Sequence, residues 1–311
     1  MPPESKSKKE AAKEQAMKEL LGSEKGDRTK TVLGLSAALV ALFSFMAALD
    51  FLESLNLPLD PIDYIIFAML SMLGPYGFYV STKEKHTREI ETRLPDFLRD
   101  VAEAGRFGMT LADSIVVASS GRYGRLTPEI KKMAAQIEWG VPASEAVQLL
   151  SERVKTPLVG RMTSIIRKAN DAGGNVADVL TMVSSDAKET ILTQEERSVT
   201  MSTYVMVVYI SFFVFIATII ILQAQFLPKM EEAGQTVSDQ AADMGEEIPG
   251  VNIQVSIIPE ISFIFLLSVL VHAAGDGILA GVIQKGSIPI GMRHSFIMLV
   301  AGFLTLRVLF A

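Results

Sequence analysis

Residues 203–226, TYVMVVYISFFVFIATIIILQAQF, form an apolar run that contains no charged side chain. A helix needs about 20 predominantly apolar residues to cross the hydrocarbon core of a bilayer, which is roughly 30 Å thick. Backbone N–H and C=O groups must be satisfied inside that core, and a helix satisfies them within its own segment. The run therefore predicts a transmembrane helix.

Four further apolar runs are long enough to span, and they cover residues 32–53, 60–80, 256–280 and 288–310. The composition agrees with this, because 49% of the 311 residues are hydrophobic and the mean hydropathy is +0.34. Such values are too apolar for a soluble domain of this size. We predict an all-α polytopic membrane protein with about five transmembrane helices.

The apolar runs divide the chain into segments with different expected roles. We expect a polar tail over 1–30, a transmembrane hairpin over 31–80, a polar-mixed domain over 81–202, a third span over 203–226, an acidic loop over 227–255 and two last spans over 256–311. The second span is expected to end near Ser81, before a charged linker that begins KEKHTR.

The charges near the span ends predict the orientation. The tail, the KEKHTR segment and the joint 281–294 are basic, whereas the loop 227–255 has one Lys and six acidic residues. Positively charged residues that flank spans stay in the cytoplasm. We therefore expect the tail and the 81–202 domain inside the cell, and the acidic loop and the C-terminus outside.

The polar-mixed domain has helical signals and no alternating strand pattern. Apolar residues recur with a helical period from Leu94 to Ala104. Further helix starts are indicated by capping or N-terminal proline signals, namely Thr110 with Asp113, Thr127 with Pro128, Thr156 with Pro157, and Asn175 with Asp178. We predict a bundle of about six helices, the last of which continues into the third span.

Several chemistries are excluded or disfavoured. No GxxxxGK[ST] phosphate loop is present, and the absence of cysteine removes disulfides and Cys-based sites. His86 is expected to be a solvated residue of the linker. Residues 81–200 contain 17 Lys/Arg and 17 Asp/Glu, so a nucleic-acid partner is not expected. We expect no metal and no cofactor.

A basic group in the domain is a candidate interface for an acidic protein partner. It consists of Arg106, Arg122, Arg125, Lys131 and Lys132. The alternative, which has equal weight, is that these residues are scattered surface charges in contact with solvent.

Residues 271–281, VHAAGDGILAG, place His272 and Asp276 inside an apolar span, where ionisable residues are costly. One interpretation is an intramembrane aspartyl protease of the prepilin peptidase type, which requires a second acid close to Asp276. The candidate acids are Asp50, Glu53, Asp60, Asp63 and Glu260. The predicted orientation puts all of them near outer span ends, and Glu260 is roughly 24 Å from Asp276 along the helix.

We therefore favour a pairing of His272 with Asp276, which are four residues apart and share one helix face. The surrounding small residues allow close helix approach, and they are Gly275, Gly277, Ala280 and Gly281. A clamp that holds helices together is preferred over a contact to another subunit. A small-solute transporter is disfavoured because the chain shows no inverted repeat.

Two phrases of the domain, LPDFLRDVAEAGRFGMTLADSI and WGVPASEAVQLLSERVKTPLVGRMTSIIRKANDAGGNVADVL, resemble the F domain of type II secretion systems and type IV pili. The resemblance covers about residues 92–190, and its main motif residues are Gly108, Gly140, Pro142, Gly173 and Gly174. It implies one cytoplasmic six-helix F-domain bundle between spans.

The C-terminal segment VHAAGDGILAGVIQKGSIPIGMRHSFIMLV resembles the archaeal branch, the platform proteins of the archaellum and archaeal type IV pili. Members of that branch often have two F domains, whereas this chain has one. A short form and the C-terminal half of a longer chain both stay open as explanations.

The resemblance implies a non-enzymatic platform that couples a hexameric secretion ATPase to the assembly of pilin or archaellin subunits. It also implies a homodimer or a pair with another F-domain protein, embedded in membrane lipid.

Overall fold

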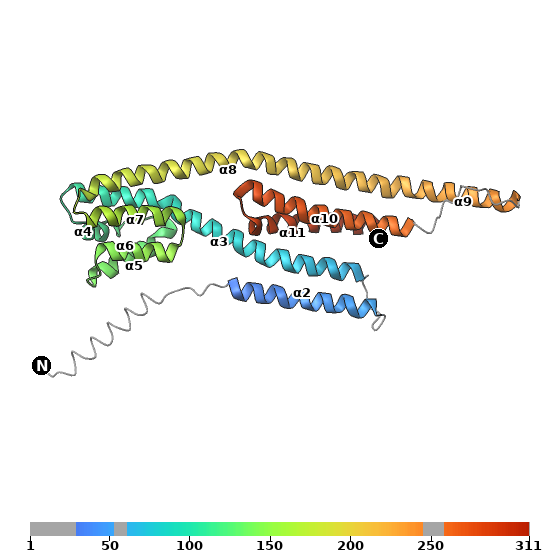
Figure 1. The fold of residues 1–311 in the computed structure, drawn as a ribbon, viewed down its shortest axis with the longest axis horizontal. Helices are drawn as coiled ribbons and strands as arrows, with labels where there is room; N and C mark the ends of the chain where they lie inside the picture. The colour runs from blue at the N-terminus through green and yellow to red at the C-terminus, as the bar shows by residue number, and fades with distance from the viewer. Residues whose placement is uncertain (1–28, 53–60, 245–257, 311) are drawn as a thin grey trace, which may run out of the picture. The chain divides into compact units, whose positions relative to one another are not determined.

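The computed structural model describes residues 29–52, 61–244 and 258–310. All regular structure in these ranges is helical (Figure 1). The helices are α2 (Thr29–Phe51), α3 (Pro61–Arg106), α4 (Leu111–Ala118), η1 (Gly124–Leu126), α5 (Thr127–Glu138), α6 (Ala143–Val154), α7 (Pro157–Asp171), α8 (Val176–Ile221), η2 (Leu222–Phe226), α9 (Leu227–Met244), α10 (Ile258–Lys285) and α11 (Ile288–Phe310). The prediction of an all-α chain is confirmed.

The helices form two compact units, which we name by their content. The bundle unit comprises Thr82–Arg197, and the spanning unit comprises Thr31–Ser81 and Ser198–Ala311. Both α3 and α8 are unbroken helices that supply residues to each unit.

In the bundle unit, six helices surround one apolar core, and α5, α6 and α7 lie side by side (Figure 1). Phe97 of α3, Met133 of α5 and Met162 of α7 are almost completely buried in that core. These six helices are α3 to α8, and the last of them continues into the third apolar run.

Three of the predicted capping signals are found as hydrogen bonds. The Thr110 hydroxyl accepts from the backbone N–H of Asp113 at 3.2 Å, and the Thr156 hydroxyl accepts from that of Val159 at 3.2 Å. Asn175 Oδ1 accepts from the N–H of Asp178 at 3.4 Å. Each bond satisfies an N–H that has no partner within its own helix.

Thr127 differs from this pattern. It is the first residue of α5, and its hydroxyl accepts from the N–H of Tyr123 at 2.8 Å, across the short helix η1. The sequence did not predict η1, since three residues are too few to show a helical period.

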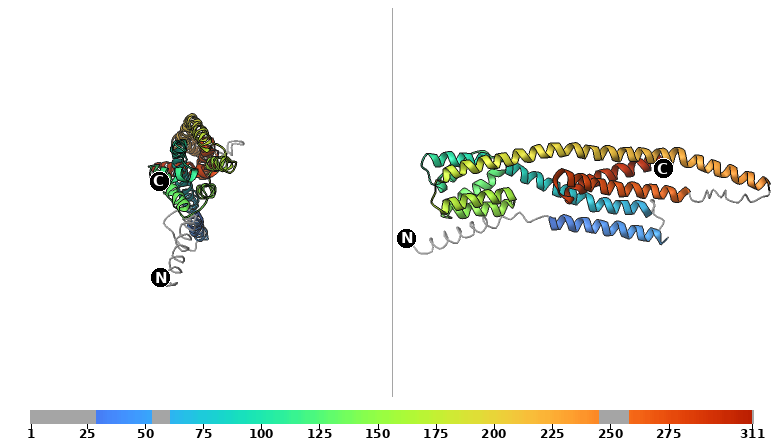
Figure 2. Two further views of the ribbon diagram at one scale, coloured as in Figure 1. Left: turned by 90° about the vertical axis from the view of Figure 1, so that its left-hand side faces the viewer. Right: turned by 45° about the horizontal axis from the view of Figure 1, so that its top comes forward.

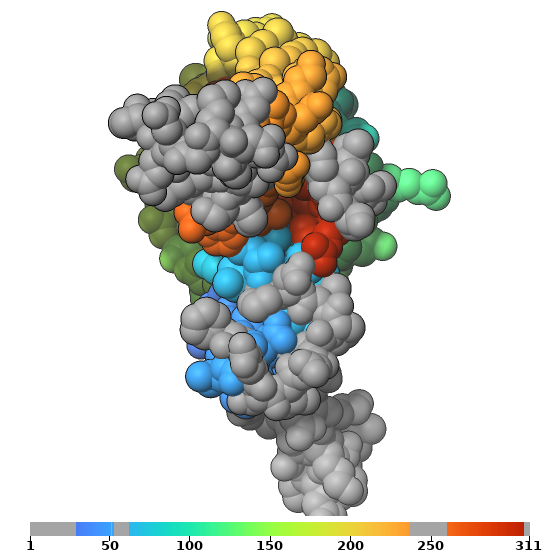
Figure 3. All heavy atoms as spheres, turned by 90° about the vertical axis from the view of Figure 1, so that its right-hand side faces the viewer, coloured from blue at the N-terminus to red at the C-terminus, as the bar shows by residue number. Residues whose placement is uncertain are grey.

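In the spanning unit, five helices are long and apolar enough to cross a membrane, counted over the described residues. Phe67 of α3 lies 5.7 Å, between ring centroids, from both Phe43 of α2 and Phe303 of α11. Figure 3 accordingly shows the cyan atoms of α3 between the blue atoms of α2 and the red atoms of α11. Figure 2 shows α10 and α11 as an antiparallel hairpin.

Three expectations about connections were wrong. The predicted linker after Ser81 is helical, because α3 continues to Arg106 through residues with good helix propensity. Much of the predicted acidic loop is also helical, since η2 and α9 (Leu227–Met244) continue directly from α8. The joint predicted over 281–294 shrinks to Gly286 and Ser287.

Candidate functional site

The predicted motif glycines lie in the turns between helices of the bundle unit. Gly108 follows α3, Gly140 follows α5 and Gly173 follows α7, and their φ angles are +86°, +94° and +68°. Residues other than glycine rarely adopt such left-handed backbone conformations, so glycine is needed for these turns. Pro142 is the N-cap residue of α6, with φ of −56°.

These turns lie at one end of the bundle unit, because successive helices run up and down (Figure 1). Three large apolar side chains in them are exposed. Phe107 is 85% exposed, and Met109 and Trp139 are also open to solvent.

The candidate basic group does not form one patch. Arg125 pairs with Glu89 and contacts His86, both on α3, whereas Arg106 donates to the Thr181 hydroxyl at 3.3 Å. Seventeen positions of one helix separate Glu89 from Arg106, which is roughly 26 Å at 1.5 Å per residue. His86 is therefore a helical residue in contact with Arg125, rather than a linker residue.

Lys132 takes part in a half-buried cluster that the sequence did not reveal. Its ammonium donates to Glu129 Oε1 at 3.2 Å, and Arg153 Nε donates to Glu129 Oε2 at 2.7 Å. Burial alone would raise the pKa of Glu129, but the hydrogen bonds from Arg153 and Lys132 outweigh it and lower the pKa. The cluster joins α5 to α6. Arg122 and Lys131 are exposed.

A second buried polar contact holds the turn after α4 against α3. The hydroxyl of Tyr123 donates to Asp100 Oδ2 at 2.6 Å. Burial, the bond to Asp100 and the negative charges of Asp100 and Asp96 raise the pKa of Tyr123. The phenol therefore stays protonated and acts as a structural donor.

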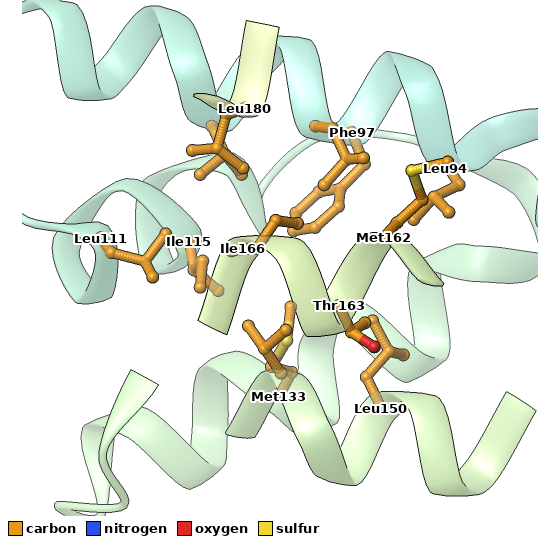
Figure 4. A pocket seen from close by; sticks show the side chains of 13 residues that line it. Leu94, Phe97, Leu111, Ile115, Met133, Leu150, Met162, Thr163, Ile166 and Leu180 are labelled. Atoms are coloured by element: carbon orange, nitrogen blue, oxygen red, sulfur yellow. The ribbon is translucent and has the colours of Figure 1, made fainter. Parts of the chain in front are cut away.

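A cavity of about 20 Å³ lies in the core of the bundle unit. Figure 4 shows Phe97, Met133, Met162 and Leu180 around it, from four different helices. Its lining is apolar apart from Thr163, and it has room for little more than one water molecule. A nucleotide or an organic cofactor does not fit there.

In the spanning unit, His272 Nδ1 lies 3.6 Å from Asp276 Oδ2 on α10. The His272 ring also packs against Phe215 of α8, with 4.2 Å between ring centroids. Of the neighbouring small residues, Gly277 and Gly281 face α11 so closely that an added Cβ would lie 2.1 Å from the backbone of Ser295 or Gly291. Gly275 has no such neighbour.

Two of the acids considered for a protease, Asp63 and Glu260, are described and lie away from Asp276. Asp63 is buried and bound to Arg307, with Nη2 2.8 Å from Oδ2, and Glu260 lies four helical turns from Asp276 on α10. Glu53 and Asp60 fall outside the described residues. Among the described residues, no group of three or more His, Asp or Glu side chains is placed to hold a metal ion.

The sequence also missed two contacts at the start of α11. Arg293 Nη1 donates to the Ser81 hydroxyl of α3 at 2.6 Å, and Tyr209 Oη of α8 lies 2.8 Å from His294 Nδ1. The position of Arg293 and His294 near the start of an apolar run was the available signal. Their partners are more than 80 residues away in the chain.

Comparison with known proteins identifies the bundle unit. Residues 97–224 match the family described as type II secretion system (T2SS), protein F. The chain contains an F domain of this family. The F domain begins in α3 and ends in η2, so the match includes the third predicted span. Proteins with this domain are non-enzymatic membrane platforms of secretion- and pilus-type machines.

The chain is also similar to a protein of Methanocaldococcus jannaschii, "Uncharacterized protein MJ1286". It is 27% identical over 274 residues, which is 86% of this chain and 42% of the relative. This chain therefore spans less than half the length of the relative. No solved structure matches the chain.

The family and the five candidate spans together make this a multi-pass membrane protein. Nothing in the geometry of Asp276 or in the comparisons favours the protease interpretation.

Proposed function

We propose that this protein is the membrane platform of an archaellum or an archaeal type IV pilus. The observation that supports it most is the F domain at 97–224, in a chain with five candidate membrane spans among the described residues. The resemblance of residues 271–300 to the archaeal branch and the similarity to a protein of Methanocaldococcus jannaschii support the archaeal assignment.

In this proposal the chain couples a hexameric secretion ATPase in the cytoplasm to pilin or archaellin subunits that leave the membrane. The F domain and the N-terminal tail lie inside the cell, and α9 and the C-terminus lie outside. The chain performs no catalysis and holds no cofactor, since ATP hydrolysis belongs to the ATPase. The partner platform is a second copy or another F-domain protein.

The helices supply a physical route for coupling. Because α3 and α8 are each 46 residues long and unbroken, a displacement of the F domain acts on the spanning unit without an intervening loop. Arg293 and His294 bind these two helices to α11 within the spanning unit. Movement of α3 or α8 would therefore reach the α10–α11 hairpin.

The turn end of the F domain is the proposed ATPase contact, because Phe107 and Trp139 are exposed there. The full-length protein in lipid nanodiscs would be mixed with the secretion ATPase of the same cell, and bound ATPase and ATP hydrolysis would be measured. We expect binding and a several-fold stimulation, both reduced by Phe107→Ser.

A matched control is Leu192→Ser, which changes an exposed apolar residue of α8 outside the turns. It should leave the stimulation intact. Absence of both binding and stimulation with the unmodified protein would contradict the coupling function. Equal loss in the two variants would reject the turn end as the contact.

A further inference from the structure

The turn end of the F domain has an excess of negative charge. The turns and the helix ends next to them, over residues 106–113, 138–145 and 168–178, contain five acidic and two basic residues. Residues 81–200 as a whole are balanced, with 17 charges of each sign. The acids are Asp113, Glu138, Glu145, Asp171 and Asp178, the bases are Arg106 and Lys168, and all seven are exposed.

Helix stability accounts for three of these acids and not for the other two. Asp113, Glu145 and Asp178 lie in the first turns of α4, α6 and α8, where a negative charge is favourable. Glu138 and Asp171 are the last residues of α5 and α7, where the partial negative charge of the helix end opposes them. Their positions indicate a positively charged partner for this end of the bundle unit.

Two aromatic side chains at the same end bury little of their surface within the described chain. Phe107 is 85% exposed and Trp139 is 39% exposed. Covering them removes apolar area from water, which is favourable. A ligand that suits the turn end therefore combines positive charge with apolar side chains.

The N-terminal tail has this composition. Residues 1–28 lie outside the described ranges, and their segment 5–18 contains five Lys and two Glu. Ala12, Ala16 and Met17 recur in that segment with a helical spacing, which places them on one side among the lysines. The segment is thus complementary to the turn end in charge and in apolar content.

The tail and the F domain also lie on the same side of the membrane, because two candidate spans separate them in the chain. In the spanning unit, α2 packs against α3 through Phe43 and Phe67. Thr31 and Ser81 are each roughly 20 Å along their helices from that contact. The start of α2 and Ser81 are therefore at the same end of the spanning unit.

The chain before α2 is long enough to reach the turn end. Along α3, Arg106 lies 25 positions beyond Ser81, which is roughly 38 Å. Fifteen residues separate Lys13 from Thr29, the first residue of α2, and in extended form they cover roughly 50 Å.

We propose that residues 5–18 of the tail bind the turn end of the F domain in the same chain. Their lysines meet the exposed acids, including Glu138 and Asp171, and their apolar side covers the aromatic rings. Opposite charges draw the two surfaces together and set their register. The bound tail occupies the surface proposed for the ATPase and so inhibits that contact. This inhibition rests on the proposed function, whereas the binding itself does not.

The absence of native cysteine allows a direct test in the full-length protein in nanodiscs. Ala16→Cys combined with Ala172→Cys, in the turn after α7, should give an intramolecular disulfide under mild oxidation, detected by mass spectrometry of peptides. The matched control combines Ala16→Cys with Ser120→Cys, an exposed position after the opposite end of α4, and should give at least fivefold less. Equal yields would overturn the proposal, and a product of twice the chain mass would overturn the assignment to the same chain.

Charge reversal tests whether the contact depends on the lysines. In the first cysteine pair, Lys8→Glu with Lys9→Glu should lower the disulfide yield at least fivefold, and Glu138→Lys with Glu145→Lys should restore it. The control pair should not respond. Failure of the restoration would refute the pairing of these charges. A yield that disappears in nanodiscs rich in anionic lipid would assign the tail to the membrane surface instead and overturn the proposal.

Deletion of residues 2–18 tests the inhibition separately. The deletion should raise the stimulation of the ATPase at least twofold when the platform is below saturation. No change on deletion, in a protein that forms the disulfide, would reject the inhibition. A failed coupling function would abolish the stimulation with every variant and leave the disulfide results unaltered, so the two failures are distinguishable.

Discussion

Single residues of the bundle unit determine where its helices stop. Gly108, Gly140 and Gly173 each take a left-handed backbone conformation directly after a helix. An L-residue pays a steric penalty there because its Cβ approaches the backbone carbonyl. The neighbouring Gly174 has no such φ angle, so two adjacent glycines have different physical roles.

We predict that Gly173→Ala lowers the free energy of unfolding by about 1–2 kcal/mol, because alanine is strained in the left-handed region. Gly174→Ala is the matched control and should change it by less than about 0.5 kcal/mol. Denaturation of the detergent-solubilised protein can be followed by the fluorescence of Trp139, the one tryptophan of the chain. Equal losses in the two variants would contradict the argument from φ.

The ionised Glu129 carboxylate stabilises the contact between α5 and α6 through Arg153 and Lys132. Because its pKa is lower in the folded protein than its ordinary value of 4.5, the stabilisation is complete above that value. It is lost as the pH falls through the folded-state pKa. We predict that Glu129→Gln lowers the free energy of unfolding by about 1–2 kcal/mol at pH 7. The loss should be much smaller at a pH below the folded-state pKa of Glu129.

The measurement is the difference in unfolding free energy between wild type and Glu129→Gln at several pH values, again through Trp139. Other carboxylates titrate in both proteins and cancel in the difference. Glu145→Gln, at an exposed position of α6, should give a difference close to zero throughout. A Glu129→Gln difference that does not shrink on acidification would reject the assignment.

At the scale of elements, the α10–α11 hairpin is defined by backbone contact rather than by large side chains. Gly281 faces Gly291, and Gly277 faces Ser295, so the two helices meet almost without intervening side chains. Such contacts substitute for the hydrophobic driving force that is absent between helices in lipid. Asp63 and Arg307 add an ion pair between α3 and α11.

We predict that Gly281→Ala destabilises the spanning unit by about 1–3 kcal/mol, as overpacking does in other cores. Its Cβ would lie 2.1 Å from the backbone of Gly291, so the helices must separate. Gly275→Ala on the same helix meets no atom within 4 Å and should be tolerated. The midpoint of thermal unfolding of the monomer in detergent distinguishes the two, and a similar midpoint for both would contradict the prediction.

At the scale of the whole molecule, the two units are connected by α3 and α8, each without a break. The predicted orientation places the F domain in the cytoplasm and α9 outside the cell. We predict that Glu231→Cys, on α9, reacts with a membrane-impermeant maleimide in intact cells. Ser120→Cys, in the F domain, should react only after the cells have been permeabilised. The reverse pattern would overturn the orientation.

Much of this architecture could be predicted because its signals are local. The five apolar runs, the caps at Thr110 and Thr156 and the turn glycines each depend on neighbouring residues in the chain. The helical nature of the KEKHTR segment was missed because a charged stretch next to a span has no apolar period. The position of Arg125 was missed because its partners on α3 are more than 30 residues away.

The sequence by itself indicated a helical chain with membrane spans, since length, hydropathy and turn chemistry are properties of short segments. The F domain was indicated by a family resemblance over about residues 92–190, and the family comparison places it at 97–224. Only the tertiary structure decided which side chains meet. It divided the candidate basic group between distant sites, and among the described acids it paired Asp63 with Arg307 and placed Glu260 four helical turns from Asp276. It also packed Gly277 against α11 and left Gly275 without a neighbour. The reason is that only one face of α10 contacts α11, and the residue type alone does not show which face that is.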